Sequence, residues 1–237
     1  VFDAIASAGS RPLALPMGTD GLDVPGAVKL IRAARPDVAY LTTFQNPTGT
    51  VLEPEEAERL LAAAAAAGTT VIDDRITGEL ALTGSPRPPL ASLGSGAPVV
   101  TVGGLSKVFW GGMRIGWLHT NATLATQLRN RKAAMDLGSP ALFQQVATRL
   151  LTEHYESTLA WRLEAMRESL AATVDAIVEH GLDWEFRTPD GGPSLGVRTP
   201  GGKAERVAAR AADAGVPVAP GTAFAVIPGA GAEYFRL

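Results

Sequence analysis

A lysine and an arginine stand seven residues apart in a glycine-rich stretch that follows a short β-branched run, 99–102. The chain has four lysines, and Lys107 is the one that lies outside segments typical of solvated helix faces or loops. An amine held beside the guanidinium of Arg114 at the end of a strand could act as a nucleophile next to an anion-binding group. The alternative interpretation is an ordinary lysine on a surface loop, which a single motif does not exclude.

Two further polar side chains, Asn46 and Asp74, each follow an apolar run that is typical of a strand. Ligands bind at the carboxyl ends of the strands in open α/β sheets. Together with Lys107, these residues would therefore offer an amide, a carboxylate and an amine to one crevice. Taken singly, Asn46 is also typical of an Asn-Pro turn and Asp74 of a cap, with Asp73 as the competing carboxylate.

Strands and helices alternate in the first half of the sequence, which predicts an α/β fold with a mostly parallel sheet. Glycine and proline mark the ends of these elements. Pro54, for example, suits the first turn of a helix, and Gly68 suits its end. We expect helices at 2–8, 25–34 and 54–67, and strands at 13–15, 37–43, 69–72 and 99–102.

The second half has a different pattern, typical of a smaller α+β unit. Apolar residues at steps of three and four predict a long helix that has one buried face and ends at Gly181. These apolar residues are Leu159, Leu163, Met166, Leu170, Val174 and Ile177. We expect the other helices at 121–137, 140–154 and 204–214, and short strands at 183–187, 194–198, 216–219 and 234–237. The predicted division is a large domain, 1–153, followed by a small C-terminal domain, 154–237.

Composition and charge exclude several classes of function. The net charge is −3 and no basic face with interleaved aromatic residues is evident, so this segment has no electrostatic footprint for nucleic acid. The chain has no cysteine and its three histidines fall in unrelated elements, so we expect no metal site. No apolar run approaches the length of a transmembrane helix. Because the chain begins at Val1 without methionine and stops at Leu237 inside an apolar pattern, we expect a fragment of a longer protein.

Five motifs occur in the same order as in one known family, and the spacings between them are compatible with that family. They are Asn46-Pro-Thr-Gly49, the strand-terminal Asp74, Leu105-Ser-Lys107, Gly112-Met-Arg-Ile-Gly-Trp117 and Tyr234-Phe-Arg236-Leu237. With them the sequence resembles, over nearly its whole length, the pyridoxal-phosphate aminotransferases of fold type I. The resemblance implies their α/β large domain, here without its N-terminal part, and their smaller C-terminal domain.

The number of residues between the lysine and the arginine indicates which members of the family the sequence resembles more. Most of these aminotransferases place the phosphate-binding arginine eight residues after the lysine, whereas Arg114 follows Lys107 by seven. The shorter spacing is similar to that in the aminotransferase-like domain of MocR regulators, in which a GntR-type winged helix is fused to this fold. Some aminoadipate-type aminotransferases share the shorter spacing, so it favours the regulators without excluding the enzymes.

The resemblance implies a role toward pyridoxal phosphate for each matched residue. Lys107 would form a Schiff base with the cofactor aldehyde, and Asp74 would hold a proton on the pyridine nitrogen, so both would be catalytic. Asn46 would donate to the phenolic oxygen of the ring. Ser106 and Arg114 would bind the phosphate.

A sixth residue, Arg236, would bind the α-carboxylate of a substrate together with Asn46. Two features depart from the family pattern. The tyrosine expected shortly after the aspartate is replaced by Ile76 and Thr77, and the serine expected three residues before the lysine is Gly104. Both departures weaken the case for efficient transamination more than the case for cofactor binding. The family's glycine-rich phosphate loop and ring-stacking aromatic residue would belong to a segment before the present chain.

Two functions of different classes agree with these residues. The favoured one is the effector domain of a MocR/GntR-type transcriptional regulator, which binds pyridoxal phosphate through Lys107 and senses an amine, an amino acid or the cofactor. DNA would be contacted only through an N-terminal domain outside this chain. The alternative is a free-standing class I/II aminotransferase, and an α/β domain without cofactor is a third possibility. For the first two, the resemblance implies a cytoplasmic homodimer with no membrane segment.

Overall fold

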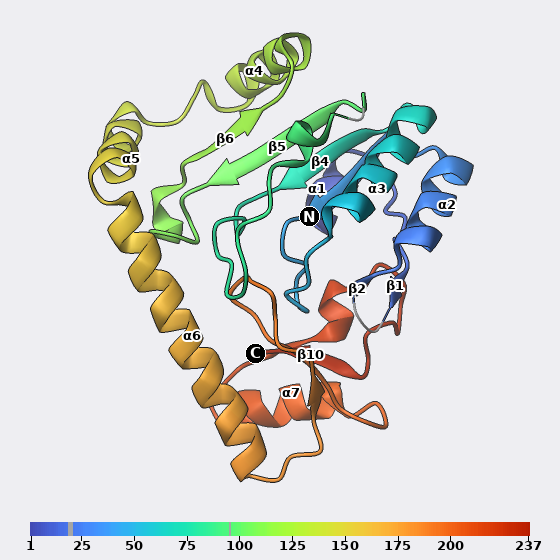
Figure 1. The fold of residues 1–237 in the computed structure, drawn as a ribbon, viewed down its shortest axis with the longest axis vertical. Helices are drawn as coiled ribbons and strands as arrows, with labels where there is room; N and C mark the ends of the chain where they lie inside the picture. The colour runs from blue at the N-terminus through green and yellow to red at the C-terminus, as the bar shows by residue number, and fades with distance from the viewer. Residues whose placement is uncertain (19–20, 95) are drawn as a thin grey trace.

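The computed structural model describes residues 1–18, 21–94 and 96–237, and its largest sheet confirms the expected α/β class (Figure 1). This sheet has the order β3-β4-β5-β6. Its strands are β3 (Val38–Thr42), β4 (Thr70–Asp74), β5 (Val99–Gly104) and β6 (Gly116–His119). The pairs β3–β4 and β4–β5 are parallel, and β6 pairs antiparallel with β5. The sequence analysis did not predict β6, because its four residues are all exposed and show no alternation of apolar and polar side chains.

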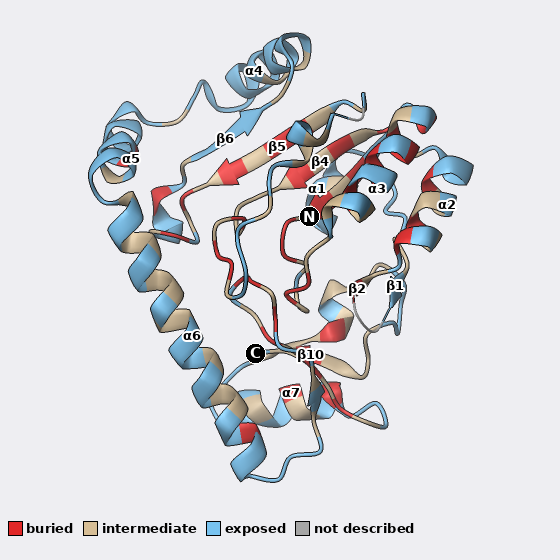
Figure 2. Ribbon diagram, viewed as in Figure 1, coloured by how far each residue is buried: buried red, intermediate tan, exposed pale blue. Residues whose placement is uncertain are grey.

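Two helices, α2 (Val24–Ala34) and α3 (Pro54–Ala67), cover one face of this sheet (Figure 2). Leu41 of β3 and Val71 of β4 are buried against them in the main apolar cluster. Both helices have strong N-terminal signals. The Asp23 carboxylate accepts a hydrogen bond from the Gly26 N–H at 3.0 Å, and Glu53 forms a reciprocal capping box with the third residue of α3.

The long helix α6 (Tyr155–Glu179) runs along one side of the molecule and joins the first sheet to the C-terminal unit (Figure 1). It follows α4 (Ala122–Asp136) and α5 (Ala141–Glu153). The expected buried face of α6 is confirmed in part: Ile177 is buried, and the other five apolar residues of that face are half-buried. The physical reason is that α6 packs on a different unit at each end, with Arg162 on the loop after β5 and Ile177 in the C-terminal core.

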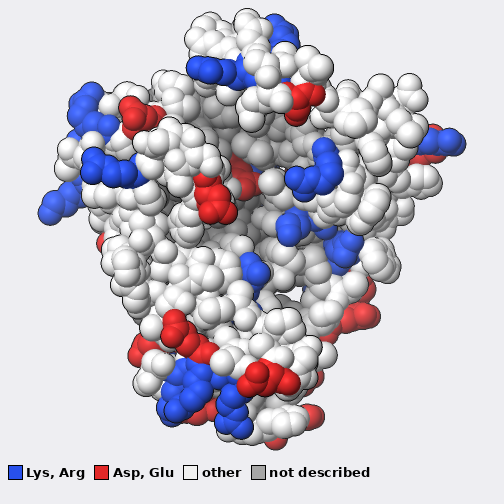
Figure 3. All heavy atoms as spheres, turned by 180° about the vertical axis from the view of Figure 1, so that it is seen from behind, with Lys and Arg blue, Asp and Glu red and all other residues white. Residues whose placement is uncertain are grey.

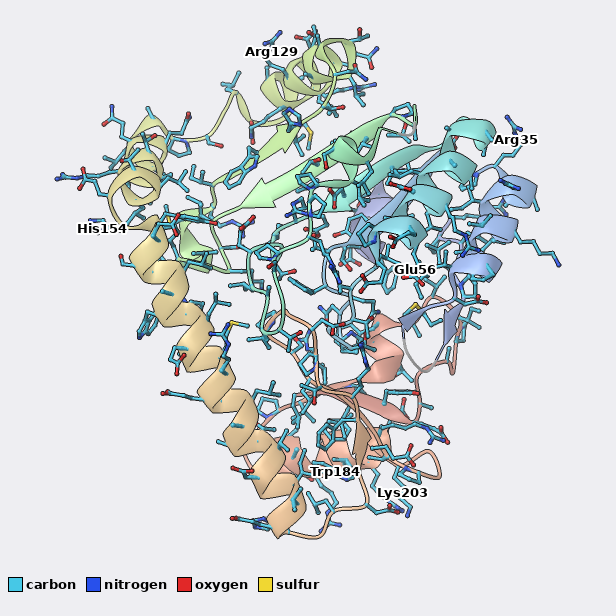
Figure 4. All side chains as sticks on the ribbon, viewed as in Figure 1. Arg35, Glu56, Arg129, His154, Trp184 and Lys203 are labelled. Atoms are coloured by element: carbon cyan, nitrogen blue, oxygen red, sulfur yellow. The ribbon has the colours of Figure 1, made fainter. Side chains whose placement is uncertain are left out.

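The C-terminal unit is a second four-stranded sheet, in the order β7-β8-β10-β9, packed on α7 (Ala204–Asp213). Its strands are β7 (Glu185–Phe186), β8 (Gly196–Arg198), β9 (Ala219–Pro220) and β10 (Tyr234–Arg236). Phe235 is fully buried, and its ring meets that of Trp184 edge-on with centroids 4.9 Å apart. Trp184 is labelled beside α7 in Figure 4.

The N-terminal segment contains α1 (Phe2–Ser7) and an antiparallel pair of short strands, β1 (Met17–Gly18) and β2 (Gly21–Leu22). The strand expected at 13–15 is wrong, since this stretch pairs with no other strand in the described residues. Its apolar pattern is accounted for by Leu15, which packs against the main apolar cluster beside α2 and α3. Of the described helices, none has both the length and the apolar character needed to span a bilayer.

Candidate functional site

The two aspartates at the end of β4 lie on opposite faces of the first sheet. Asp73 has the same parity as Val71, so it lies on the face that α2 and α3 cover, and it is 2% exposed. Its carboxylate accepts a hydrogen bond from the Leu90 N–H at 2.9 Å, and burial raises its pKa above the usual range. Asp73 therefore anchors the short 3₁₀ helix Leu90–Leu93 and is not available to a ligand on the other face.

Asp74 lies on the second face, which is only half-covered in the described structure. One carboxylate oxygen accepts a hydrogen bond from the Tyr40 hydroxyl, and the other accepts one from the Ile76 N–H at 2.9 Å. In the sheet, Asp74 is in register with Thr42 of β3 and with Val102 of β5. Of the two adjacent aspartates, Asp74, to which the resemblance assigns the role, is thus the one accessible near the carboxyl ends of three neighbouring strands.

The Asn46 loop leaves the end of β3 and meets the last strand of the chain. Asn46 is exposed, precedes a cis peptide bond to Pro47, and accepts a hydrogen bond through its Oδ1 from the Arg236 Nη1 at 3.4 Å. Arg236 also stacks on the ring of Phe224, 4.7 Å from its centroid. The structure therefore brings together two of the predicted site residues that are farthest apart in the sequence.

A loop of the C-terminal unit packs tightly behind the Asn46 loop. The Asp190 N–H donates to the Gly49 carbonyl at 2.9 Å, and the Asp190 carboxylate accepts from the Val51 N–H at 3.3 Å. Gly49 has a φ of 68°, and a Cβ there would come within 2.3 Å of the Cβ of Pro189. The glycine at the end of the Asn-Pro-Thr-Gly motif thus permits this close approach.

The loop between β5 and β6 carries three of the predicted residues and is closed at its base. The Leu105 N–H donates to the Ile115 carbonyl at 3.3 Å. Ser106 and Arg114 directly adjoin this pair, so a hydroxyl and a guanidinium start from the same end of the loop. Arg114 has a φ of 52°, a left-handed conformation that a non-glycine residue adopts rarely and that is often found at functional sites.

Lys107 is exposed in this loop, next to buried neighbours that fix the backbone. Leu105 and Met113 pack against Ala147 of α5. From α6, the Arg162 guanidinium donates to the carbonyls that follow Lys107, at 3.4 Å and 3.1 Å. Within the described part of the chain, the side chains of Lys107 and Arg114 make no hydrogen bond or ion pair with another residue, which leaves both cations available to a ligand.

A hollow between the first sheet and the C-terminal unit is visible from the side opposite to Figure 1, with acidic and basic atoms inside it (Figure 3). Among the described residues, no group of three His, Cys, Asp or Glu side chains is arranged to hold a metal ion. The functional groups at the candidate site are thus a carboxylate, an amide, a lysine amine and arginine guanidinium groups.

Sequence reasoning missed two residues that contact the site, Tyr40 and Arg162. Tyr40 is two positions before Thr42 on the same strand face, so its contact with Asp74 depends on the register of β3 against β4. Arg162 lies on α6, far from the Lys107 loop in sequence. The signal available for both was weak: a tyrosine inside a strand and an arginine on a predicted partly buried helix are common in ordinary structure.

Comparison with known proteins extends over almost the entire chain. The sequence profile of the family "Aminotransferase class I and II" matches residues 10–237. The chain belongs to this family. A similar solved structure confirms the expected fold type for this aminotransferase-family chain. It is the crystal structure of LysN, an α-aminoadipate aminotransferase from Thermus thermophilus, complexed with N-(5′-phosphopyridoxyl)-L-leucine. The TM-score is 0.88 at 29% identity, over 97% of this chain and 60% of that one.

Curated relatives of this aminotransferase-family chain include both regulators and enzymes. YdfD, an HTH-type transcriptional regulator of Bacillus subtilis, is 30% identical over 78% of this chain and 39% of its own length. The 2-aminoadipate transaminase of Thermus thermophilus is 30% identical over 91% of this chain and 56% of its own length. The chain therefore spans only about half of the length of the relatives that it matches.

Proposed function

We propose that this chain is the pyridoxal-phosphate-binding, aminotransferase-like effector domain of a MocR/GntR-type transcriptional regulator, with Lys107 as the residue that binds the cofactor covalently. The observation that carries the proposal is the order of the first sheet: β3, β4 and β5 are neighbours in parallel, and their carboxyl ends lead to Asn46, Asp74 and Lys107. Ligands of α/β sheets bind at this edge.

The donor groups of these residues fit the chemistry of pyridoxal phosphate. When bound, the cofactor supplies an aldehyde, which joins a lysine amine with loss of one water, and a protonated ring that withdraws electrons. Asp74, whose two oxygens already accept hydrogen bonds, offers a negative charge that favours a proton on the ring nitrogen. Asn46 offers an amide to the phenolic oxygen. Ser106 and Arg114 offer a hydroxyl and a guanidinium fork to the phosphate.

Three observations support a regulator. The YdfD regulator is among the relatives at 30% identity, and TauR, an HTH-type transcriptional regulator of Rhodobacter capsulatus, is 29% identical over 93% of the chain. The spacing of seven residues from Lys107 to Arg114 agrees with that class. Ile76 and Thr77 stand where the enzymes have a tyrosine near the phenolic oxygen, so the chain lacks a group that assists efficient turnover.

For the whole protein we propose a cytoplasmic homodimer that responds to a small amine or amino acid and contacts DNA through a separate N-terminal domain. Within the present chain, residues 1–153 would form the cofactor-binding unit and residues 154–237 the small unit. The second candidate is a free-standing aminotransferase that transfers an amino group from an amino acid to a 2-oxo acid. The contact between Arg236 and Asn46 favours it, because a guanidinium beside an amide suits a substrate carboxylate.

Two assays on the intact, cofactor-loaded protein separate these functions. One measures transamination with a panel of amino acids and 2-oxoglutarate, and the other measures binding to DNA from the upstream region of its own gene. A regulator is expected to bind this DNA with an affinity that pyridoxal phosphate changes, and to show little or no turnover. Sustained turnover without DNA binding would contradict the regulator and support the enzyme.

A further inference from the structure

Tyr40 contacts the carboxylate of Asp74, the predicted catalytic residue, and has no role in the proposed binding of the cofactor. It lies in β3, half-buried, and donates its hydroxyl proton to Asp74 of β4. The second oxygen of Asp74 accepts from the Ile76 N–H at 2.9 Å. The carboxylate is therefore held from two sides, by a side chain of the neighbouring strand and by the backbone of its own loop. Each of its oxygens keeps a further lone pair for a ligand.

The Tyr40 hydroxyl acts as a donor over the whole physiological range. Burial raises the pKa of Tyr40 well above its ordinary value, and the hydrogen bond to Asp74 and its charge raise it further. A hydroxyl that stays protonated beside a carboxylate can donate a charge-assisted hydrogen bond to it. The other charged groups at this strand end are Asp73, on the opposite face, and Arg75, whose guanidinium donates to the Arg87 carbonyl at 2.9 Å.

We propose that Tyr40 is a positioning residue that holds the Asp74 carboxylate in the orientation in which it would face the ring nitrogen of bound pyridoxal phosphate. This inference rests on the cofactor binding put forward under the proposed function. Because these two hydrogen bonds fix the orientation of the carboxylate, Asp74 would be placed to accept a hydrogen bond from a protonated ring nitrogen. The other two tyrosines lie elsewhere: Tyr155 begins α6 beside Phe109, and Tyr234 begins β10.

The test is nuclear magnetic resonance of the intact protein loaded with pyridoxal phosphate that carries ¹⁵N at the ring nitrogen, recorded from pH 6 to pH 10. In Tyr40→Phe we expect the ratio of protonated to unprotonated ring nitrogen to fall roughly tenfold, or about one pH unit, as for the loss of one hydrogen bond to a charged group. Tyr155→Phe is the matched control, since burial also raises the pKa of Tyr155, to about 12, and it is expected to match the wild type.

Tyr40→His keeps a hydrogen-bond donor and serves as the second variant if the phenylalanine variant folds poorly. It is expected to retain most of the wild-type ring protonation. An unchanged ¹⁵N titration in Tyr40→Phe overturns the positioning role, even if the variant binds the cofactor less tightly. A wild-type protein that does not take up pyridoxal phosphate at all overturns the proposed cofactor binding itself, so the two failures are distinct.

Discussion

The Nη1 of Arg236 lies 3.4 Å from the Oδ1 of Asn46, although the two residues are 190 positions apart in the sequence. The contact joins β10 of the C-terminal unit to the loop that follows β3 of the first sheet. Arg236 is held on its other side by the ring of Phe224. A ligand carboxylate that binds this guanidinium would therefore lie where the two units of the chain meet.

Removal of this guanidinium is expected to weaken the binding of an amino acid effector or substrate. In Arg236→Met, dissociation constants for amino acids should rise tenfold or more, since a hydrogen bond to a charged group contributes about 1.5–3 kcal/mol. The measurement is titration of the cofactor-loaded protein followed by its visible absorption. Arg210→Met, at an exposed site in the last turn of α7, is the control. Equal affinities in both variants would show that Arg236 does not bind the ligand carboxylate.

Because Pro189 packs closely against Gly49, substitution of Gly49 by alanine should reduce stability more than the same substitution at another glycine of similar conformation. Gly49 and Gly68 have φ values of 68° and 74°, but nothing lies within 4 Å of a Cβ at Gly68. Gly68→Ala should cost about 1–2 kcal/mol through the left-handed backbone alone. Gly49→Ala should cost a further 1–3 kcal/mol because the added methyl meets Pro189. Urea unfolding compares them, and equal losses would contradict the proposed packing of the two loops.

The burial of Asp73 predicts a defined pH dependence of stability. Because its pKa is raised in the folded state, Asp73 favours folding below its unfolded pKa of about 3.9, and this contribution is lost as pH rises through the higher folded value. Asp73→Asn removes that titration. The variant should therefore gain stability relative to the wild type between pH 4 and pH 7, as measured by urea unfolding at both values.

Asp136 provides a control of opposite sign for this experiment. It is exposed, and its hydrogen bond to Lys132 at 2.7 Å lowers its pKa. Its small contribution to stability is present above the unfolded pKa and is lost as pH falls. The stability of Asp136→Asn relative to the wild type should therefore decrease as pH rises from 4 to 7. A rise in relative stability for both variants would mean that the pH dependence does not come from the burial of Asp73.

The alternation of elements in the first half was sufficient to predict the α/β class and the strand ends that carry Asn46, Asp74 and Lys107. Local patterns decide these features, because helix caps and apolar runs act over a few residues. The resemblance favoured Asp74 over Asp73, but only the sheet shows which of the two carboxylates is covered. Which of two adjacent side chains is covered depends on where α2 and α3 pack, and that is a long-range outcome.

Contacts that depend on strand register or on packing between distant segments could not be predicted from the sequence. The hydrogen bond from Tyr40 to Asp74 requires the alignment of β3 with β4, in which Thr42 and not Tyr40 is directly opposite Asp74. Arg162 reaches the Lys107 loop because the N-terminal half of α6 packs beside that loop. The half-exposed face of α6 has the same origin, since a repeat of apolar residues does not reveal how much of a helix its partners cover.

The visible absorption of the intact protein with added pyridoxal phosphate tests covalent binding through Lys107 most directly. We expect a visible band of lysine-bound cofactor in the wild type and in Lys203→Ala, whose lysine lies in an exposed segment before α7. We expect the band to be lost in Lys107→Ala, and borohydride reduction followed by peptide mass analysis to locate the cofactor on Lys107 of the wild type. A colourless wild type, or an undiminished band in Lys107→Ala, would contradict the assignment.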